Sequence, residues 1–247
     1  MRIFLAGVES AVGWAIKQDN LNGVNILQSF YYTNDRIASL IPSLGDFLLD
    51  SGAYTFIAGC HGKEIIWEEY ADRYADFVNR HHIEKFFELD IDSIVGYQRV
   101  KELRNRIEKA TGKQSIPVWH KSRGWEVYIR ECQEYPYVSL GGIAIKELSK
   151  KDYSAFPAII AEAHKWGAKI HGLGFTQLAL LPRYHFDSVD STSWNTGNRF
   201  GYLYEFDGKT MQKHVAPLGK RLSDARAVAL HNFTEWVKFQ RYAEVHL

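Results

Sequence analysis

The chain of 247 residues is 46% hydrophobic and 24% charged, and its 30 Lys and Arg residues nearly balance 29 Asp and Glu. These proportions are typical of a globular protein and exclude a disordered, collagen-like or disulfide-scaffold chain. Two cysteines, Cys60 and Cys132, are too few for a disulfide framework or a cysteine-rich zinc site, so we expect a reducing, cytoplasmic environment.

Short apolar runs alternate with longer amphipathic stretches along the whole chain. Several of these runs, such as IFLAGV and KIHGLGF, are apolar on successive residues, as expected for strands covered on both faces. The predicted strands are residues 3–8, 25–32, 46–51, 85–91, 116–120, 137–142, 169–175 and 185–191.

The stretches between the strands have the spacing of helices. Tyr70, Tyr74 and Val78 share one face of residues 68–82, and residues 96–112 end at Gly112, a residue typical of helix ends. Another helix is predicted before Gly167. The longest one covers 222–245, with Ser223 or Asp224 as its N-cap.

Eight strand–helix repeats are typical of a single (β/α)8 TIM barrel that spans residues 1–247, and a doubly wound open sheet is the main alternative. Residues 195–215 predict a β-hairpin insertion after strand eight, turning at Asp207 and Gly208, before the long C-terminal helix. The start of the sequence lacks the pattern of a signal peptide. No apolar run reaches the roughly 18 residues of a membrane span, so we expect no membrane partner.

Polar residues gather where the predicted strands end, which is where a barrel builds its active site. The candidate residues are Asp50, Ser51, Gly52 and Tyr54 after strand three, Asp90 and Asp92 after strand four, His120 after strand five, and Asp187 and Asp190 in strand eight. Each one also has a structural explanation, since Asp often caps helices and a lone His is more often a hydrogen-bonded core residue. Together they favour a catalytic site.

Taken in order, these motifs resemble those of the tRNA-guanine transglycosylase superfamily, and most of all the phage and bacterial DNA 7-deazaguanine transglycosylases. The similar segments are Asp50-Ser51-Gly52-Ala53-Tyr54, Glu88-Leu89-Asp90-Ile91-Asp92, Gly141-Gly142-Ile143-Ala144, His171-Gly172-Leu173-Gly174 and Phe186-Asp187-Ser188. They span residues 48–192. Enzymes of this family are TIM barrels that exchange guanine in a nucleic acid for a 7-deazaguanine base such as preQ0 or preQ1.

The resemblance implies roles for individual residues. Asp187 would be the nucleophile at the sugar C1′, with Asp190 as a competing candidate, and Asp50 would be the general acid and base. The implied base-binding residues are Ser51, Tyr54, Asp90, Asp92, His120, Gly141, Gly142, Ile143, His171 and Gly172. His120 stands where the family often has a base-reading glutamine, and His171 replaces an apolar stacking partner.

Two departures from the family bear on the polymer that is modified. The bacterial tRNA enzymes carry a three-Cys, one-His zinc site, which two cysteines cannot supply, so we expect no metal and no other cofactor. The archaeal enzymes append an RNA-binding domain, and we expect only a hairpin and a helix after strand eight. We therefore expect DNA as the substrate, with tRNA as the alternative, and a homodimer or a partner protein is a further possibility for nucleic-acid grip.

Candidate contacts to the nucleic acid come from two places. Lys121 and Arg123 follow strand five and could meet phosphates near the barrel mouth, whereas Trp194 and Arg199 lie in the segment that we expect to cover the site. A net charge of +1 predicts no strong overall attraction to nucleic acid. Two other interpretations remain open, namely a hydrolase or lyase acting on a nucleoside or small sugar, and a catalytically inactive base-binding barrel.

Overall fold

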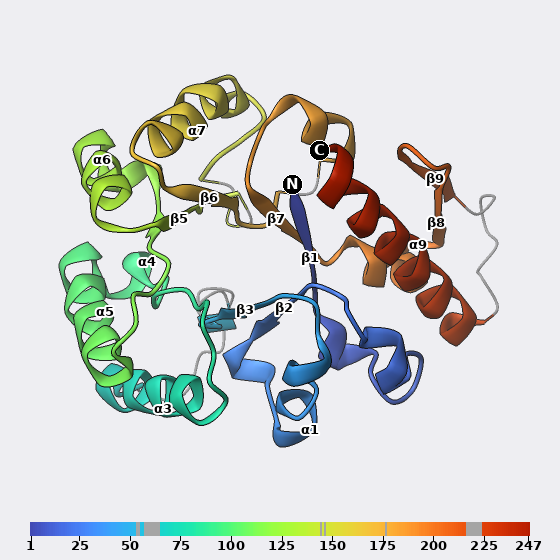
Figure 1. Cartoon of the computed structure of the whole chain (residues 1–247), viewed down its shortest axis with the longest axis horizontal. Helices are drawn as coiled ribbons and strands as arrows, with labels where there is room; N and C mark the ends of the chain where they lie inside the picture. Colours follow the sequence, from blue (N-terminus) through green and yellow to red (C-terminus); the bar gives the residue numbers. More distant parts are fainter. Residues whose placement is uncertain (53–54, 57–64, 144, 146, 176, 216–223) are drawn as a thin grey trace.

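Seven parallel strands form one curled sheet, with the strand order β3-β2-β1-β7-β6-β5-β4. The computed structural model describes residues 1–52, 55–56, 65–143, 145, 147–175, 177–215 and 224–247. The strands are β1 (Arg2–Ala6), β2 (Ile26–Ser29), β3 (Phe47–Asp50), β4 (Val118–Trp119), β5 (Tyr137–Leu140), β6 (Lys169–Gly172) and β7 (Ser188–Ser191). Each of them overlaps a predicted strand, and only β1 begins outside its predicted range, one residue earlier. The helices lie around the outside of the sheet (Figure 1).

The predicted strand 85–91 is not a named strand of the structure. Only Phe86 and Phe87 pair there, through single parallel bridges to Leu49 of β3 and to Ile116, just before β4. Pairing then passes to a side chain, because the Glu88 carboxylate accepts a hydrogen bond from the Val118 amide (2.8 Å) where a strand would offer a backbone carbonyl. The sequence-based range for this strand was therefore too long.

The helices of the described residues cover the outer face of the sheet. They are α1 (Asp35–Ala38), α3 (Trp67–Arg80), α4 (Asp92–Val95), α5 (Tyr97–Thr111), α6 (Trp125–Glu134), α7 (Phe156–Lys165), α8 (Gly197–Phe200) and α9 (Ala225–His246). Two predicted helix ends are confirmed. Gly112 ends α5 with a left-handed φ of 66°, and the Asp224 side chain caps α9 by accepting from the Ala227 amide (2.9 Å).

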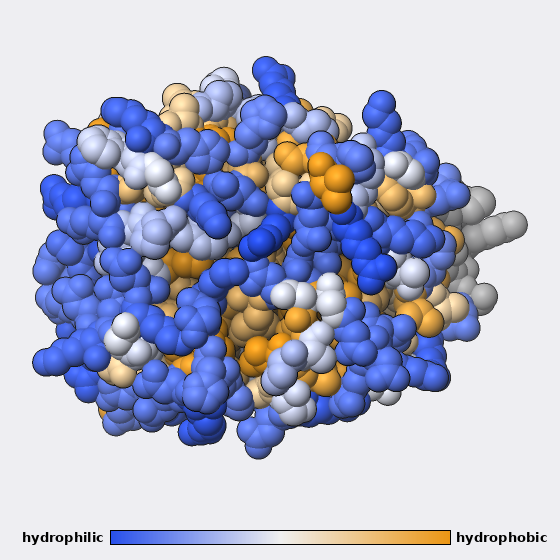
Figure 2. Space-filling model, viewed as in Figure 1, coloured by the Kyte–Doolittle hydropathy of each residue, from blue (hydrophilic) through white to orange (hydrophobic). Residues whose placement is uncertain are grey.

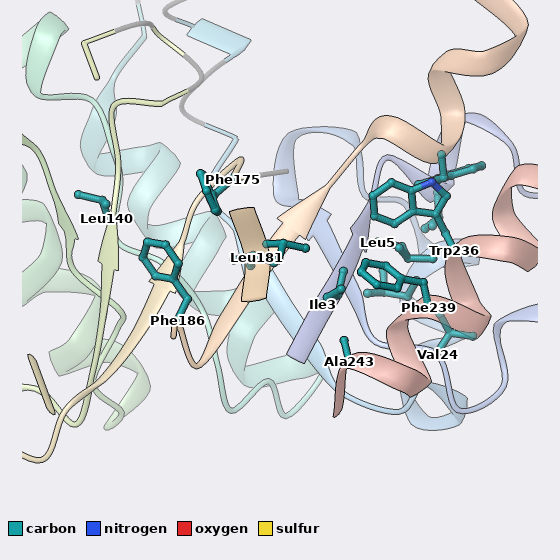
Figure 3. Packing of buried hydrophobic residues seen from close by; sticks show 14 of the residues in the cluster. Ile3, Leu5, Val24, Leu140, Phe175, Leu181, Phe186, Trp236, Phe239 and Ala243 are labelled. Atoms are coloured by element: carbon teal, nitrogen blue, oxygen red, sulfur yellow. The ribbon is translucent and has the colours of Figure 1, made fainter. Parts of the chain in front are cut away.

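The predicted hairpin is confirmed as β8 (Tyr202–Phe206) and β9 (Met211–Val215), an antiparallel pair with Gly208 in its turn at a φ of 93°. Helix α9 packs against both this hairpin and β1. Figure 3 shows Trp236 and Phe239 of α9 beside Ile3 and Leu5 of β1, where they form part of the buried apolar core. The last helix thus covers the sheet at β1, and the hairpin packs against this helix.

The outer surface is mainly polar. On the face shown in Figure 2, hydrophilic residues form most of the surface and apolar residues are visible in smaller areas between them. Of the helices that the structure describes, none combines the length and the hydropathy that crossing a bilayer requires.

Candidate functional site

A cavity of about 380 Å³ opens where the carboxyl ends of the strands meet. Residues that follow β1, β2, β3, β4, β5, β6 and β7 all contribute to its wall, as does Asp90, which follows the short bridge at Phe87. The lining residues are Ala6, Gly7, Glu9, Leu27, Ser29, Tyr32, Asp50, Thr55, Asp90, His120, Gly142, Ile145, Leu173, Gly174, Asp190 and Thr192. We call it the acidic cavity, because Glu9, Asp50, Asp90 and Asp190 supply four carboxyl groups.

Asp50, the last residue of β3, is an acid whose protonation is strongly altered by this cavity. Burial raises its pKa to about 7, and the charges of Asp90 and Asp190 act in the same direction. A hydrogen bond from the Gly52 amide to Asp50 Oδ2 (2.9 Å) opposes the shift. A side chain at Gly52 would come within 2.6 Å of Tyr31 Cβ, and its φ is 81°, so this turn requires glycine. Asp50 can therefore exchange a proton near neutral pH.

Asp190 reaches the same cavity from β7. Its Oδ1 accepts hydrogen bonds from the Gly174 amide (2.5 Å) and from His171 Nε2 (3.2 Å), and only 10% of its side chain is exposed. The predicted convergence of Asp50 and Asp190 is thus confirmed. Each acid also has a different set of neighbours, as a pair with separate roles requires.

His120 lies between two carboxylates at the end of β4. Its Nε2 is 2.6 Å from Asp90 Oδ1 and its Nδ1 is 2.6 Å from Glu147 Oε2. Burial disfavours the charged ring, but the hydrogen bonds to Asp90 and Glu147 outweigh it and raise the pKa of His120 to about 9. At neutral pH both ring nitrogens therefore donate to these acids, and His120 contributes a positive charge to the cavity wall.

Glu147 is held in place by the same contacts. Burial disfavours its charge, yet hydrogen bonds from His120 and from the Ser122 amide (2.9 Å) lower the pKa of Glu147. Gly142, with a φ of 85°, lies beside this carboxylate, and a Cβ there would come within 2.9 Å of Glu147 Oε2. Gly142 was predicted to bind the base and does line the cavity, whereas Glu147 was missed.

The exits of the first two strands also supply residues that the sequence analysis missed. Glu9, in the 3-10 helix Val8–Ser10 after β1, lines the cavity, and burial raises its pKa even though its own backbone amide and the Gln28 side chain oppose the shift. Ser29, the last residue of β2, and Tyr32, which follows it, also line the cavity. The signal was present, because Glu9 and Ser10 follow the first predicted strand and SFYY forms the end of the second, where polar residues were also chosen in the others.

Asp187 lies at the opposite end of the sheet. It immediately precedes β7, where Arg2 at the start of β1 pairs with Ser188. Its Oδ2 is 2.9 Å from His164 Nε2 and accepts from the Ile170 amide (2.8 Å). Together with Arg2 and Lys85 it lines a second cavity of about 440 Å³. The expectation that Asp187 shares a site with Asp50 is wrong, because strand β7 begins after Asp187 and carries Asp190 to the other end.

Asp92 and Arg123 bind each other rather than a base and a phosphate. Arg123 Nε is 2.5 Å from Asp92 Oδ2, and its Nη1 is 2.8 Å from Glu88 Oε1 and 3.3 Å from Glu131 Oε1. Only 1% of the Arg123 side chain is exposed. The predicted phosphate contact of Arg123 is therefore wrong, and Asp92 is not among the residues that line the acidic cavity.

The other predicted nucleic-acid contacts have mixed outcomes. Trp194 is fully buried and its indole Nε1 donates to the Ala6 carbonyl (2.9 Å), so it cannot cover the cavity from outside. Lys121 is 63% exposed and pairs with Asp152 (2.9 Å). Tyr54 and the side chain of Arg199 lie outside the described part of the structure.

The remaining predicted base-binding residues support the cavity from behind. Ser51 and His171 are buried, and a Cβ on Gly141 would meet the ring of His120 at 2.8 Å. Ile143 packs against the apolar core, and Gly172 makes room for Phe175 and Phe186, since a Cβ there would lie 3.2 Å from Phe175 Cβ and 3.3 Å from the ring of Phe186. None of these residues is among those that line the cavity.

The arrangement combines an acid that titrates near pH 7, a second carboxylate held by two donors, and a fixed positive charge, all at one cavity wall. Such a set can protonate a leaving group and stabilise positive charge on a sugar. Within the described residues, no group of three or more His, Cys, Asp and Glu side chains is arranged to hold a metal ion. No protein-family model matches the chain, and no curated protein matches its sequence.

Proposed function

We propose that the protein is a base-exchange glycosyltransferase of the tRNA-guanine transglycosylase type, which replaces guanine in DNA with a 7-deazaguanine base. The observation that carries the proposal is the meeting of Asp50 and Asp190 in one cavity with different surroundings. The pKa of Asp50 is raised to about 7, whereas Asp190 accepts two hydrogen bonds that hold its carboxylate in place. Paired carboxylates of this kind perform glycosidic-bond cleavage with retention.

In the first half of the proposed reaction, the sugar is transferred to the enzyme. An Asp190 oxygen attacks C1′ and forms a C–O ester bond while the C1′–N9 bond to guanine breaks. The electron pair of that bond goes to the departing base, which takes a proton from Asp50. The raised pKa of Asp50 keeps a protonated fraction available at neutral pH, as general-acid catalysis requires.

In the second half, the same residues act in reverse. The incoming deazaguanine loses its ring N–H proton to Asp50, and its nitrogen attacks C1′ to release the Asp190 carboxylate. The numbers of atoms and charges balance across the exchange, since one proton leaves Asp50 and one returns. This step competes with attack by water, so the enzyme must keep water from the ester.

Base recognition in this proposal rests on Asp90. A guanine edge presents N–H donors, which suit a carboxylate acceptor. His120 occupies Asp90 Oδ1, which orients the carboxylate and leaves Oδ2 to face a ligand. His120 would thus position Asp90 rather than read the base itself, because both of its ring nitrogens already have partners.

The fold that we propose for this function is a closed eight-stranded barrel. Support comes from the bridges of Phe86 to Leu49 and of Phe87 to Ile116, which connect the two edges β3 and β4 of the curled sheet. Backbone hydrogen bonds from Phe87 to Leu49 (2.9 Å) and from Ile116 to Phe86 (2.8 Å) accompany them. Residues 86–87 would then be the eighth strand, as short as β4.

The choice of DNA rests on the sequence. The bacterial tRNA enzymes that the motifs resemble bind zinc through three cysteines, and this chain has two in all. The predicted contacts to the nucleic acid need revision, because Arg123 and Trp194 are buried. Exposed groups at the cavity rim, such as Tyr32, which is 50% exposed, are better placed to stack on bases.

The test uses the full chain with preQ0 or preQ1 and either plasmid DNA or tRNA, followed by nucleoside mass spectrometry of the digested polymer. We expect deazaguanine in DNA with wild type and none with the double variant Asp50→Asn, Asp190→Asn. Incorporation into tRNA alone would mean that the substrate is tRNA and not DNA. Release of free guanine without incorporation would mean that the enzyme hydrolyses the glycosidic bond and does not exchange the base. The absence of any reaction with either polymer would overturn the proposal.

A further inference from the structure

A row of polar side chains crosses the interior of the sheet behind the acidic cavity. Ser139 of β5, His171 of β6 and Ser188 of β7 are register partners on neighbouring strands, and all three are buried. His171 Nδ1 lies 2.6 Å from Ser188 Oγ, and its Nε2 lies 3.2 Å from Asp190 Oδ1. Ser188 Oγ also bonds to the hydroxyl of Tyr137, at the start of β5. A continuous chain of hydrogen bonds therefore leads from Tyr137 to Asp190.

The chemistry of the groups gives this chain a direction. An ionised carboxylate only accepts hydrogen bonds, so His171 Nε2 must carry the proton that it shares with Asp190. In a neutral imidazole Nδ1 is then an acceptor, which receives the Ser188 hydroxyl proton, and Ser188 Oγ in turn accepts from Tyr137. Every donor in the chain points towards Asp190.

The surroundings hold the imidazole in this orientation. The ring of His171 is fully buried between aromatic side chains, 6.1 Å from the ring centre of Phe4 and 5.4 Å from that of Phe87. Apolar neighbours offer no competing hydrogen bonds, and hydrogen bonds are stronger where water is excluded. The Gly174 amide is a second donor to the same Asp190 oxygen.

The other end of the chain reaches the opposite side of the sheet. Tyr137 and Ser188 line the second cavity, the one that contains Asp187, while Asp190 lines the acidic cavity. The hydrogen bonds therefore connect the two ends of the curled sheet through its interior. A core that needed only packing would fill these positions with apolar side chains, since buried polar groups lower stability unless every partner is satisfied.

We propose that Tyr137, Ser188 and His171 form a positioning relay, which holds the Asp190 carboxylate in the orientation that attacks the sugar. This inference rests on the proposed function of Asp190 as nucleophile. The relay residues touch neither substrate nor reacting atoms, and they act through Asp190. The contribution of each residue to kcat falls with its distance from Asp190 along the row of hydrogen bonds, so that His171 contributes most and Tyr137 least.

The first experiment measures kcat and KM for base exchange, with melting temperature as a control for folding. His171→Leu lowers kcat about 100-fold with KM within about twofold, because the donor to Asp190 is lost. His171→Gln places an amide N–H near the former Nε2 and recovers about tenfold of that loss. Ser188→Ala lowers kcat about tenfold and Tyr137→Phe about threefold.

The chain offers a matched control in Ser139→Ala. Ser139 is as buried as Ser188 and lies at the same level on the other side of His171, but its hydroxyl donates to the His171 backbone carbonyl (3.2 Å). This variant should keep the wild-type kcat. Equal losses for Ser139→Ala and Ser188→Ala, or a folded His171→Gln no better than His171→Leu, would show that these residues only support the fold.

The second experiment does not depend on activity and separates the relay from the proposed function. Nitrogen-15 NMR of histidine-labelled protein reports which ring nitrogen carries the proton. We expect His171 as the Nε2–H tautomer in wild type, with its Nδ1 signal altered in Ser188→Ala. An Nδ1–H tautomer in an enzyme that exchanges bases would overturn the relay, whereas the Nε2–H tautomer in a protein without exchange would overturn only the function.

Discussion

Two groups of carboxylates lie close together near the ends of the strands, and their charges are met in different ways. In the arginine cluster, made up of Glu88, Asp92, Glu131, Arg104 and Arg123, each acid is within 3.3 Å of a guanidinium nitrogen. In the acidic cavity, no Lys or Arg is among the described residues that line the wall, and His120 supplies the positive charge. The first group has its partners from the fold itself. The second has no arginine partner among the described residues, and its Asp90 and Asp190 contact histidines instead.

The difference separates acids that pair with arginine inside the fold from acids that line a cavity, where the proposed chemistry would use them. In the arginine cluster, burial raises the pKa of Glu88 while Arg123 and Arg104 oppose the shift, so the charge of Glu88 has partners within the fold. An acid that is desolvated among other acids has a raised pKa, as Asp50 has, and its protonation lowers the repulsion around it. Sequence motifs alone do not distinguish the two groups, since Glu88, Asp90 and Asp92 belong to one pentapeptide and divide between them.

The largest expected effect comes from substituting each of the two candidate nucleophiles, Asp190 and Asp187, in a separate variant. Asp190→Asn should lower the rate of base exchange by about 10⁴-fold, because the attacking carboxylate is lost. Asp187→Asn should leave the rate within about twofold, since Asp187 lies beside His164 at the other end of the sheet. Initial rates of deazaguanine incorporation measure both. A strong loss in Asp187→Asn with an active Asp190→Asn would reverse the assignment made from the structure.

The arginine cluster should show its effect in stability. Arg123→Met leaves the buried Glu88 and the half-buried Asp92 without their main partner and should lower the free energy of unfolding by about 3–5 kcal/mol. Lys121→Met removes an exposed ion pair two residues away and should cost less than about 1 kcal/mol. Urea denaturation measures both variants. Equal stabilities would mean that the cluster does not hold α5 and α6 in place, and that the contrast with the cavity fails.

His120 should make the free energy of unfolding of the protein depend on pH. Because its pKa is raised from 6.5 to about 9 in the folded chain, the native state keeps a proton that the unfolded state releases between these values. Its contribution is therefore complete below pH 6.5 and is lost as the pH rises through 9. His120→Gln should cost roughly 2 kcal/mol at pH 6 and much less at pH 9.5.

A matched variant isolates this effect from general charge changes. His185 is exposed on the surface, so His185→Gln should change the free energy of unfolding by less than about 0.5 kcal/mol at both pH values. Chemical denaturation at the two pH values measures the difference. A cost of His120→Gln that is the same at pH 6 and 9.5 would show that His120 is not charged between Asp90 and Glu147.

Much of the fold could be predicted because its signals are local. Apolar runs located all seven strands of the sheet, Gly112 and Asp224 marked helix ends, and the hairpin turns at Asp207 and Gly208 as expected. The range 85–91 failed because Glu88 is a polar residue that takes the place of a backbone partner, which hydrophobic pattern cannot reveal.

The site was harder to predict, because its members depend on contacts between distant segments. Asp50, Asp90, His120 and Gly142 follow from the rule that sites form at strand ends. Asp187 and Asp190 are three residues apart, and only the start of β7 after Asp187 decides which end each one occupies. The position of Arg123 after a predicted strand suggested an exposed phosphate contact. Its burial depends on the acids Asp92 of α4 and Glu131 of α6.

The smallest effect expected is also the sharpest contrast with the arginine cluster. The pKa of Asp50 rises from 3.8 in the unfolded chain to about 7 in the fold, so the native state holds a proton that the unfolded state has released. Stability therefore falls as the pH rises from 4 to 7, and above 7 the fold carries an unfavourable charge. Asp50→Asn should stabilise the protein at pH 8 by roughly 1–2 kcal/mol, less than the full shift implies because the residue is half-buried.

At pH 4.5 the same variant should have nearly the stability of wild type, while base exchange is abolished at either pH. Asp76→Asn, at an exposed position of α3, should change stability by less than about 0.5 kcal/mol throughout. Thermal and urea denaturation at the two pH values provide the measurement. If Asp50→Asn is as destabilising as Arg123→Met, then Asp50 is a structural acid like Glu88, and the cavity loses the proton donor on which its chemistry depends. A gain at pH 8 with loss of exchange would identify Asp50 as an acid retained for reaction at the expense of stability.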